Sequence, residues 1–393
     1  MLTRAVVRFA LVVFVAVPLL SVIADARRLH LGAPDPNAVL RITGYSYGTV
    51  WRYNQTYPPQ TVNGDGWATT WDRLGRIVSI SNDSSDWNGS GIPHNAMANL
   101  LTNTKMDATT VGSTLNPMTA WVGGGPPSGD HKWNGLISVK GVLYGILTWF
   151  THPGSYYSTI IKSVDDGAHF TPVPPGSGPY TSPMFPIPDN MPYEFIQYGQ
   201  DYTGTGVDNS DKYVYAIVSL YPGRTRFISA LGRVPYGDTP SCASGLPDIC
   251  RQNPADWSFW TGDSNGLNWS STITDGAEIP NNSATTNAFI DNMQYLPRYR
   301  QYVSIAAAYP DPTNAQSTWY VQACDHPWGP CNQIQGGRHW NPEGLYLPSI
   351  APHSLVNGGQ QFVIMTAGDY DDCCAMTNTN RYTLTMVPAT LTP

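Results

Sequence analysis

The 393-residue chain is poor in charged residues and contains no cluster of basic ones. Lys, Arg, Asp and Glu together account for 12% of the residues, and the formal net charge is −7 at pH 7. Nucleic acids and anionic membrane surfaces attract proteins mainly through clustered Lys and Arg side chains. The composition therefore argues against both of these partners for the mature chain.

Helical periodicity is also lacking. No long segment places apolar residues at i, i+3, i+4 and i+7 behind a capping residue. Instead, short runs of β-branched and aromatic residues are separated by turn-forming residues, among them 37 Gly and 34 Pro. This pattern is typical of an all-β protein with many loops.

Motifs of several other chemistries are absent. There is no G-x-S-x-G nucleophile elbow, and the eight histidines are scattered, which argues against a serine or cysteine hydrolase. There is no C-x-x-C spacing, and we expect neither a metal nor a cofactor. The six cysteines occur as Cys242/Cys250, Cys324/Cys331 and Cys373/Cys374. The first two pairs predict disulfides that close short loops, with a zinc site near His326 as the alternative. The adjacent pair forms either a vicinal disulfide or bonds elsewhere.

The chain has a single long apolar run, from Phe9 to Ile23. It follows Arg4 and Arg8 and precedes the small residues of Ala24-Asp-Ala26. A basic start, an apolar stretch of about 15 residues and a small-x-small site are typical of a secretory signal peptide, and a bilayer span needs roughly 20. We expect residues 1–26 to be a signal peptide, with an uncleaved anchor as the alternative. The mature chain would then be secreted or periplasmic.

A loose internal repeat is present in the rest of the chain. Strand-like runs of similar texture recur at 76–81, 135–150, 212–221, 299–309 and 361–368. Their spacing of roughly 55 to 90 residues leaves room for one four-stranded sheet in each unit. The repeat predicts one domain over residues 38–393 that folds as a five-bladed β-propeller and is a monomer. A β-sandwich with long loops is the alternative.

Two turns carry a further signal of this fold. Ser163–Phe170 fits the pattern S-x-D-x-G-x-x-F of an Asp-box hairpin, and Thr261–Trp269 is a variant that is one residue longer. In such a turn the Asp side chain accepts hydrogen bonds from backbone N–H groups. Asp165 and Asp263 are therefore predicted to be structural rather than catalytic.

The stretch Gly64–Trp87 contains the first candidates for chemistry. It predicts a hairpin with strands at Ala68–Trp71 and Arg76–Ile80. Because a hairpin returns the chain to the edge where it started, Asp65 and Asp83 are expected to lie close together. Two carboxyl groups at such a spacing can act as acid and base on a glycosidic bond, although Asp also caps turns frequently.

The aromatic content favours a carbohydrate polymer as the partner. The chain has 13 Trp and 23 Tyr, and aromatic rings can stack on the apolar faces of sugars. The candidates for substrate binding are Trp67, Trp71, Asp86, Trp87 and Trp133, with core packing as the alternative for each tryptophan. Further acids in aromatic surroundings are Glu194, Glu278, Asp291 and Glu343. A last acidic group, Asp369, Asp371 and Asp372, lacks the spacing of a calcium loop and favours a solvated turn.

Several segments, in their correct order, resemble a bacterial family known as domain of unknown function 4185. The family's opening pattern, from G-D-N-W to Y-G-D-G, resembles 64–84 here, and its K-x-x-G-L-x-x-V-x-G-V-L-Y pattern resembles Lys132–Tyr144. Other similar segments are Ser163–Phe170, Asp211–Tyr215, Cys324–Pro330 and Phe362–Asp369. The resemblance covers most of the mature chain.

The resemblance implies a propeller related to glycoside hydrolase family 183, whose members are endo-D-arabinanases. The catalytic acids of the hydrolytic members correspond to Asp65 and Asp83. Two departures concern the substrate more than the acids: Gly66 replaces the family's Asn, and Ser81-Asn-Asp-Ser84 replaces Y-G-D-G. We therefore expect a secreted hydrolase of a polysaccharide, with arabinan as one candidate. A glycan-binding propeller without catalysis and a lyase with other catalytic residues are the alternatives.

Overall fold

The structure is a computed structural model in which part of the chain is described. The described residues are 40–48, 51–52, 64–85, 93–101, 112–116, 130–151, 155–173, 183–203, 213–221, 227–236, 256–280, 289–308, 318–338, 346–355, 357–368 and 382–393. The chain divides into Met1–Ala38 and Val39–Pro393, and every described residue belongs to the second unit. Several predictions lie outside the described residues: the signal peptide at 1–26, Asp86, Trp87, Glu343, the acidic group at 369–372, and the pairs Cys242/Cys250 and Cys373/Cys374.

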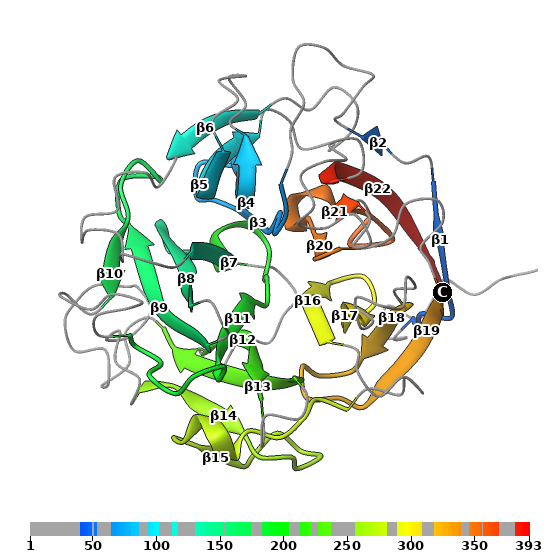
Figure 1. Ribbon diagram of the computed structural model, residues 1–393. Helices are drawn as coiled ribbons and strands as arrows, with labels where there is room; N and C mark the ends of the chain where they lie inside the picture. Colours follow the sequence, from blue (N-terminus) through cyan, green and yellow to red (C-terminus); the bar gives the residue numbers. More distant parts are fainter. Residues whose placement is uncertain are drawn as a thin grey trace, which may run out of the picture. The chain divides into compact units, whose positions relative to one another are not determined.

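The described part of Val39–Pro393 forms five antiparallel sheets arranged around a common centre (Figure 1). Blade 1 contains β3 (Thr69–Trp71), β4 (Ile77–Ser85), β5 (Pro93–Leu101) and β6 (Gly112–Asn116). Blade 2 contains β7 (Asp130–Val139), β8 (Val142–Thr151), β9 (Ser155–Ser163) and β10 (Thr171–Val173). Blade 3 contains β11 (Met191–Phe195), β12 (Tyr213–Leu220), β13 (Ile228–Pro235), β14 (Ser258–Trp260) and β15 (Trp269–Ser270). Blade 4 contains β16 (Phe289–Leu296), β17 (Gln301–Ala308), β18 (Thr318–Cys324) and β19 (Cys331–Arg338).

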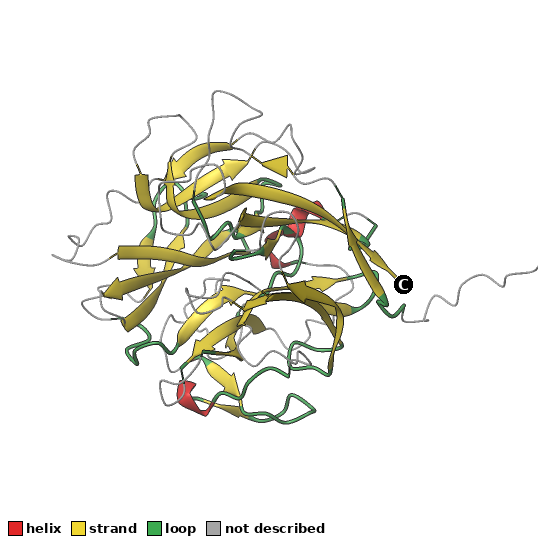
Figure 2. Cartoon of the chain, turned by 45° about the vertical axis from the view of Figure 1, so that its right-hand side comes forward, coloured by secondary structure: helices red, strands yellow, loops and turns green. Residues whose placement is uncertain are grey.

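Blade 5 combines the two ends of the described unit. It contains β20 (Ser349–Ile350), β21 (Gln361–Gly368), β22 (Tyr382–Thr392) and the N-terminal strands β1 (Gly44–Tyr47) and β2 (Trp51–Arg52), both of which pair with β22. The other described elements are the short 3-10 helices η1 (Gln200–Tyr202), η5 (Ile273–Asp275) and η6 (Pro352–Ser354), and no described residue lies in an α-helix (Figure 2). No helix among the described residues is long and apolar enough to cross a membrane.

This architecture confirms the prediction of an all-β, five-bladed β-propeller. Each repeated strand-like run falls in a different blade. In each blade it overlaps the second strand from the centre, and these strands are β4, β8, β12, β17 and β21. The sandwich alternative required two facing sheets. The strand-like runs resemble one another because each blade buries the faces of its middle strands against two neighbouring blades.

The hydrophobic core lies between neighbouring blades. Between blades 1 and 2, Ala68, Val78 and Ile80 pack with Leu143 and Ile161, all of them buried. A second cluster joins blade 4 to blade 5, and the largest one extends over blades 2, 3 and 4. Each fully buried aliphatic side chain stabilises the fold by about 1.5–3 kcal/mol. Because both faces of a blade are covered by neighbours, its middle strands are apolar on both faces.

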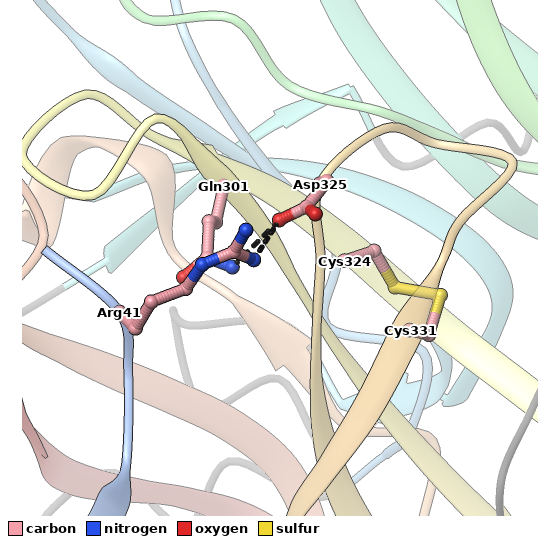
Figure 3. The surroundings of a disulfide bond; sticks show 5 residues. All are labelled: Arg41, Gln301, Cys324, Asp325 and Cys331. Atoms are coloured by element: carbon pink, nitrogen blue, oxygen red, sulfur yellow. Dashed lines mark hydrogen bonds and ion pairs between the residues drawn. A yellow bond between two sulfur atoms is a disulfide. The ribbon is translucent and has the colours of Figure 1, made fainter. Parts of the chain in front are cut away.

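The ring is closed by pairing between the two ends of the unit. Gly44 pairs with Thr392 and Tyr47 with Ala389, so β1 becomes the outermost strand of the blade that β20 begins. The segment just before β1 also contacts blade 4, where Arg41 forms an ion pair with Asp325 (Figure 3).

The predicted pair Cys324/Cys331 forms a disulfide across the turn between β18 and β19 (Figure 3). Both sulfur atoms are used in this bond, so they are not available as zinc ligands, and the His326 ring stacks on Trp328. The expectation of a loop-closing disulfide is confirmed for this pair.

Both Asp-box aspartates are structural, as predicted. Asp165 accepts hydrogen bonds from the His169 backbone N–H at 2.9 Å and the Ser163 hydroxyl at 2.8 Å. Desolvation alone would raise its pKa, but these hydrogen bonds and the His169 side chain lower the pKa to about 2. Asp263 accepts from the backbone N–H groups of Leu267 at 2.9 Å and Asn268 at 3.1 Å. Both turns join outer strands of their blades, away from the centre.

A buried histidine lies at the end of the innermost strand of blade 5. His353, in η6, is 7% exposed, and neither ring nitrogen has a partner among the described residues. Burial lowers the pKa of this ring to about 3, so it is neutral in the folded protein.

His353 is expected to make the fold acid-sensitive. The unfolded chain takes up a proton near pH 6.5, whereas the folded chain does so only near pH 3, so stability decreases as the pH falls through this window. The full linkage amounts to roughly 4 to 5 kcal/mol. Urea unfolding of His353→Leu between pH 3 and 7 should show a flatter dependence of the unfolding free energy on pH. The exposed His326→Gln is the control and should follow the wild type. Parallel curves for wild type and His353→Leu would contradict this origin.

Candidate functional site

The centre of the propeller is lined by the first strand of each blade, namely β3, β7, β11, β16 and β20 (Figure 1). A bridge between Gln197 and Gln294 shows that the chain of β11 and that of β16 run parallel and side by side. Glu194 and Asp291 each lie three residues before these bridged glutamines, so they stand at a similar height along the axis. Asp65 precedes β3 on the innermost segment of blade 1. We call Asp65, Glu194 and Asp291 the carboxyl cluster.

A β-bulge occurs at the corresponding place in several innermost strands. The register shifts between Trp133 and Gly135 in β7, between Pro192 and Glu194 in β11, and between Ile290 and Asn292 in β16. The residues left between these pairs are Asn134, Tyr193 and Asp291. A bulge bends its strand and re-aims the extra side chain, and bulges are frequent beside active sites.

Blade 1 carries the same irregularity just after Asp65. Asp65 is bridged to Asn82, whereas Thr69 pairs with Ser79, so the inner segment is one residue longer than the part of β4 that it faces. The insertion therefore recurs in the innermost chain segments of blades 1 to 4, and in blades 2 to 4 the extra residue is polar.

Electrostatic interactions connect Tyr193 with groups from four of the blades. The pKa of Tyr193 is raised well above its ordinary value of 10, first by burial and then by the charges of Asp291, Tyr346, Asp65 and Glu194. Interactions between charges weaken with distance, so these groups lie in the neighbourhood of Tyr193. Blades 1, 3, 4 and 5 thus contribute to the same site.

Glu194 has the properties of an acid that keeps its proton. Its side chain is 3% exposed, and Oε1 accepts a hydrogen bond from the Phe195 backbone N–H at 3.0 Å. Burial raises the pKa of Glu194 well above 4.5, against the backbone hydrogen bonds from Phe195 and Leu136, and the charge of Asp291 raises it further. A carboxyl group in such surroundings can donate a proton near neutral pH.

The other two members of the carboxyl cluster are anchored by the backbone. The Ala307 N–H donates to Asp291 Oδ2 at 3.1 Å. The Asp65 backbone exchanges two hydrogen bonds with Asn82, at 2.9 and 2.7 Å. Both side chains are buried, with Asp65 at 6% and Asp291 at 3% exposure. Their positions therefore depend on the sheets rather than on loops.

The segment 133–135 of β7 connects Asp65 to Glu194. The Asn82 side chain donates to the Trp133 carbonyl at 3.0 Å and accepts from the Trp133 N–H at 2.6 Å. On the other side, a Cβ atom at Gly135 would come within 3.0 Å of the Tyr193 carbonyl oxygen and 3.1 Å of the Glu194 Cα. Glycine at this position is what allows β7 and β11 to approach so closely.

Polar side chains join the innermost strands farther along the axis. Thr70 Oγ1 donates to Gln197 Oε1 at 3.1 Å and accepts from the Ser138 N–H at 2.9 Å. Gln197 Nε2 donates to the Leu136 carbonyl at 2.6 Å, and Gln294 Nε2 donates to the Gln197 carbonyl at 3.3 Å. These bonds link blades 1, 2, 3 and 4 directly beneath the carboxyl cluster.

Of the tryptophans that were candidates for substrate binding, the structure describes Trp67, Trp71 and Trp133. Trp67 and Trp133 are fully buried, and their Nε1 atoms donate to the carbonyls of Gly64 and Gly135, respectively. Their rings fill the core between blades and present no face to a sugar. Trp71 is half-buried at the far end of β3 from Asp65.

Two other acidic candidates, Asp83 and Glu278, are not assigned to the carboxyl cluster. Asp83 follows Asn82 in β4, which agrees with the predicted hairpin, but its side chain lies outside the described part. Glu278 is bridged to Ala230, which belongs to the third strand of blade 3 and not to an innermost one. Sequence reasoning included Glu194 and Asp291 among several acids but had no basis for selecting them, and it did not consider Tyr193 or Tyr346. The bulges that single out Tyr193 and Asp291 are a property of strand pairing.

No protein-family model and no curated protein matches this sequence. Membership of the domain of unknown function 4185 family is therefore not shown. Solved structures of similar fold are found at low identity. An endo-arabinase from Bacteroides thetaiotaomicron VPI-5482 aligns with a TM-score of 0.47 and 10% identity over 88% of this chain and 98% of that chain.

Two further structures give the same result. The α-L-arabinofuranosidase PaAbf62A from Podospora anserina has a TM-score of 0.45 and 9% identity over 88% of this chain and 97% of that one. The Bacteroides ovatus protein Xyloglucan PUL GH43B has a TM-score of 0.43 and 11% identity over 81% of this chain, which spans only 50% of that protein.

Gly66 and Asn82 are an exchanged pair relative to the pattern that the sequence resembles, which has Asn and Gly at these positions. Gly66 has φ of 64°, a left-handed conformation that Asn also tolerates. A Cβ atom on Gly66 would lie 2.6 Å from Asn82 Nδ2. The Asn82 amide therefore occupies, from β4, the space that a side chain at position 66 would need.

A double-mutant cycle tests this exchange. Gly66→Asn alone should destabilise the fold by about 1–3 kcal/mol through overpacking. Asn82→Gly alone should cost about 2–3 kcal/mol because both bonds to Trp133 are lost. The double variant should be more stable than the sum of the two effects by at least about 1 kcal/mol, measured by urea unfolding. Strict additivity would show that the two positions do not share this space.

Proposed function

We propose that this chain is a secreted glycoside hydrolase that acts on a polysaccharide by acid/base catalysis in the carboxyl cluster. The observation that carries the proposal is that Asp65, Glu194 and Asp291 lie on the innermost chain segments of three blades and all act electrostatically on Tyr193. Cleavage of a glycosidic bond needs one protonated and one ionised carboxyl group. A buried Glu194 with a raised pKa, beside two other carboxyl groups, supplies this combination.

Glu194 is assigned as the general acid. Its proton passes to the glycosidic oxygen as the bond to the leaving sugar breaks, which leaves Glu194 as a carboxylate. Asp65 is assigned as the base that takes a proton from the attacking water. Its position on the innermost segment of blade 1 and the resemblance of its motif to that of the domain of unknown function 4185 family both favour this role. Burial, together with a smaller effect from the charge of Asp291, raises the pKa of Glu194 and so favours its protonated form.

The finer aspects of the proposal rest on the sequence. The apolar run at 9–23 supports export, and the motif order supports kinship with the domain of unknown function 4185 family and an arabinan-type substrate. Asp83 remains a candidate for the base because it follows the residue that is bridged to Asp65. A glycan-binding propeller without catalysis is the competing function, and the same experiments distinguish the two.

Variants of the carboxyl cluster should lose activity without losing the fold. Purified wild type is first screened against arabinans, arabinogalactans and a panel of plant and microbial glycans by release of reducing ends. On the glycan that is cleaved, Glu194→Gln and Asp65→Asn should each lower kcat by about 10²–10⁴-fold, as expected for loss of a general acid or base. The matched control is Glu278→Gln, a half-buried glutamate outside the carboxyl cluster, which should keep wild-type activity.

Three outcomes would contradict parts of this assignment. If Glu194→Gln and Asp65→Asn keep wild-type rates, the cluster is not catalytic. If Asp83→Asn abolishes cleavage and Asp65→Asn does not, the base is Asp83. Binding of a glycan by the wild type without any cleavage would favour the competing binding function.

The pH dependence should identify the acid. Because the pKa of Glu194 is raised, kcat/KM of the wild type should remain high above pH 4.5 and fall only when Glu194 loses its proton. Glu194→Gln should lack this basic limb. Its loss of rate should be smaller on aryl glycosides, whose leaving groups need little protonation. A basic limb that persists in Glu194→Gln would assign the acid to another residue.

A further inference from the structure

Tyr193 has no role in the acid/base chemistry proposed above, although it directly precedes Glu194 in the bulge of β11. A carboxylate only accepts hydrogen bonds, whereas a sugar presents hydroxyl groups and ring oxygens that also need donors. The proposed catalysis uses the proton of Glu194 and leaves the base as an acceptor. The site is therefore complete only with a further donor that keeps its proton.

The backbone places Tyr193 where such a donor is needed. It is the extra residue of the β11 bulge, directly before Glu194, and the same strand position holds Asn134 in β7 and Asp291 in β16. In a regular strand, adjacent side chains point to opposite faces. Here the bulge breaks that alternation, and both Tyr193 and Glu194 interact with Asp291.

Tyr193 combines a fixed backbone with partial exposure of the residue. Gly135 of β7 packs against its backbone carbonyl, which holds the residue from the neighbouring blade. The residue as a whole is half-buried, unlike the adjacent Pro192 and Glu194, which are buried. A residue that is held by its backbone and is less buried than its neighbours in the strand is suited to contact a ligand.

The ionisation of Tyr193 is consistent with a donor rather than a nucleophile. Burial and the surrounding carboxylates raise its pKa well above 10, so the hydroxyl keeps its proton wherever the carboxyl groups are functional. Asn134, the extra residue of the β7 bulge, has an amide oxygen that can accept a hydrogen bond. Its Nδ2 donates to Thr148 Oγ1 at 2.7 Å, which orients the amide, and Oδ1 has no partner among the described residues.

We propose that Tyr193 contacts the substrate directly, with its hydroxyl donating a hydrogen bond to an oxygen of the sugar ring or of a ring hydroxyl held between Glu194 and Asp65. This inference rests on the proposed function of the same site. The substrate would be a sugar that has an oxygen acceptor beside the scissile bond. Tyr193 would help to bind this sugar and to orient it. No proton is transferred to or from Tyr193 in the reaction.

The test compares Tyr193→Phe with Tyr213→Phe, a half-buried tyrosine of the neighbouring strand β12, in the full chain. The probe is the glycan that the wild type binds or cleaves in the panel, beginning with arabinan and its oligosaccharides. Binding is measured in the Asp65→Asn background, in which cleavage is slow. The double variant Asp65→Asn/Tyr193→Phe should bind the glycan about five- to tenfold more weakly than Asp65→Asn, because one hydrogen bond to the sugar is lost. In the active background, Tyr193→Phe should lower kcat/KM by at least that factor and keep the basic limb of the pH profile.

The outcomes separate this inference from the proposed function. If the wild type cleaves the glycan and Tyr193→Phe binds and cleaves it as well as Tyr213→Phe does, the Tyr193 contact is wrong and the hydrolase stands. If the wild type binds the glycan without cleaving it, and Tyr193→Phe binds more weakly, the contact stands and the hydrolase is wrong. Loss of the basic limb in Tyr193→Phe would make Tyr193 a proton donor and overturn the inference, as would the absence of binding to every glycan of the panel. Thermal midpoints within about 2 °C of the wild type show that the variants fold.

Discussion

Closure of the ring by the pairing of β1 with β22 is the constraint on which the rest of the structure depends. Asp65, Glu194, Asp291 and Tyr346 come from four different sheets, and no hydrogen-bonded ladder connects those sheets directly. Their relative positions are set by how the blades pack around the axis and by the polar links between neighbouring blades. Since β1 completes the last blade and its neighbouring segment reaches blade 4 through Arg41, the two ends of the unit hold all the blades in register.

Within that ring, short polar links set the distances between neighbouring blades. The Asn82 amide bonds the backbone of β7, the Ser229 hydroxyl accepts from the Ile290 N–H at 2.7 Å, and the Asn292 amide accepts from the Ile350 N–H at 3.1 Å. Apolar packing alone tolerates small sliding movements, whereas buried hydrogen bonds have a defined length and direction. These links are the reason that residues on separate sheets can act as one site.

Much of the fold could be predicted from the sequence, but little of the site. The repeat, the hairpin of β3 and β4, the Asp-box turns and the disulfide Cys324–Cys331 depend on residues that are close in the chain, and the structure confirms them. The hairpin makes Asp65 a candidate, and its catalytic role is a prediction. The tryptophans Trp67 and Trp133 were assigned to sugar binding because of their residue type, yet they are core residues. A side chain's type does not show which face of its blade it occupies.

The sequence by itself determined that this is an all-β propeller with short-range turns and a locally closed disulfide, because those features depend on alternation, glycine and spacing. Only the tertiary structure decided which acids belong together. Glu194 and Asp291 lie 97 positions apart and come together because β11 and β16 run side by side at the axis. The choice of Tyr193 has the same origin, since the bulge in which it is the extra residue arises from pairing between strands and has no signature in the local sequence.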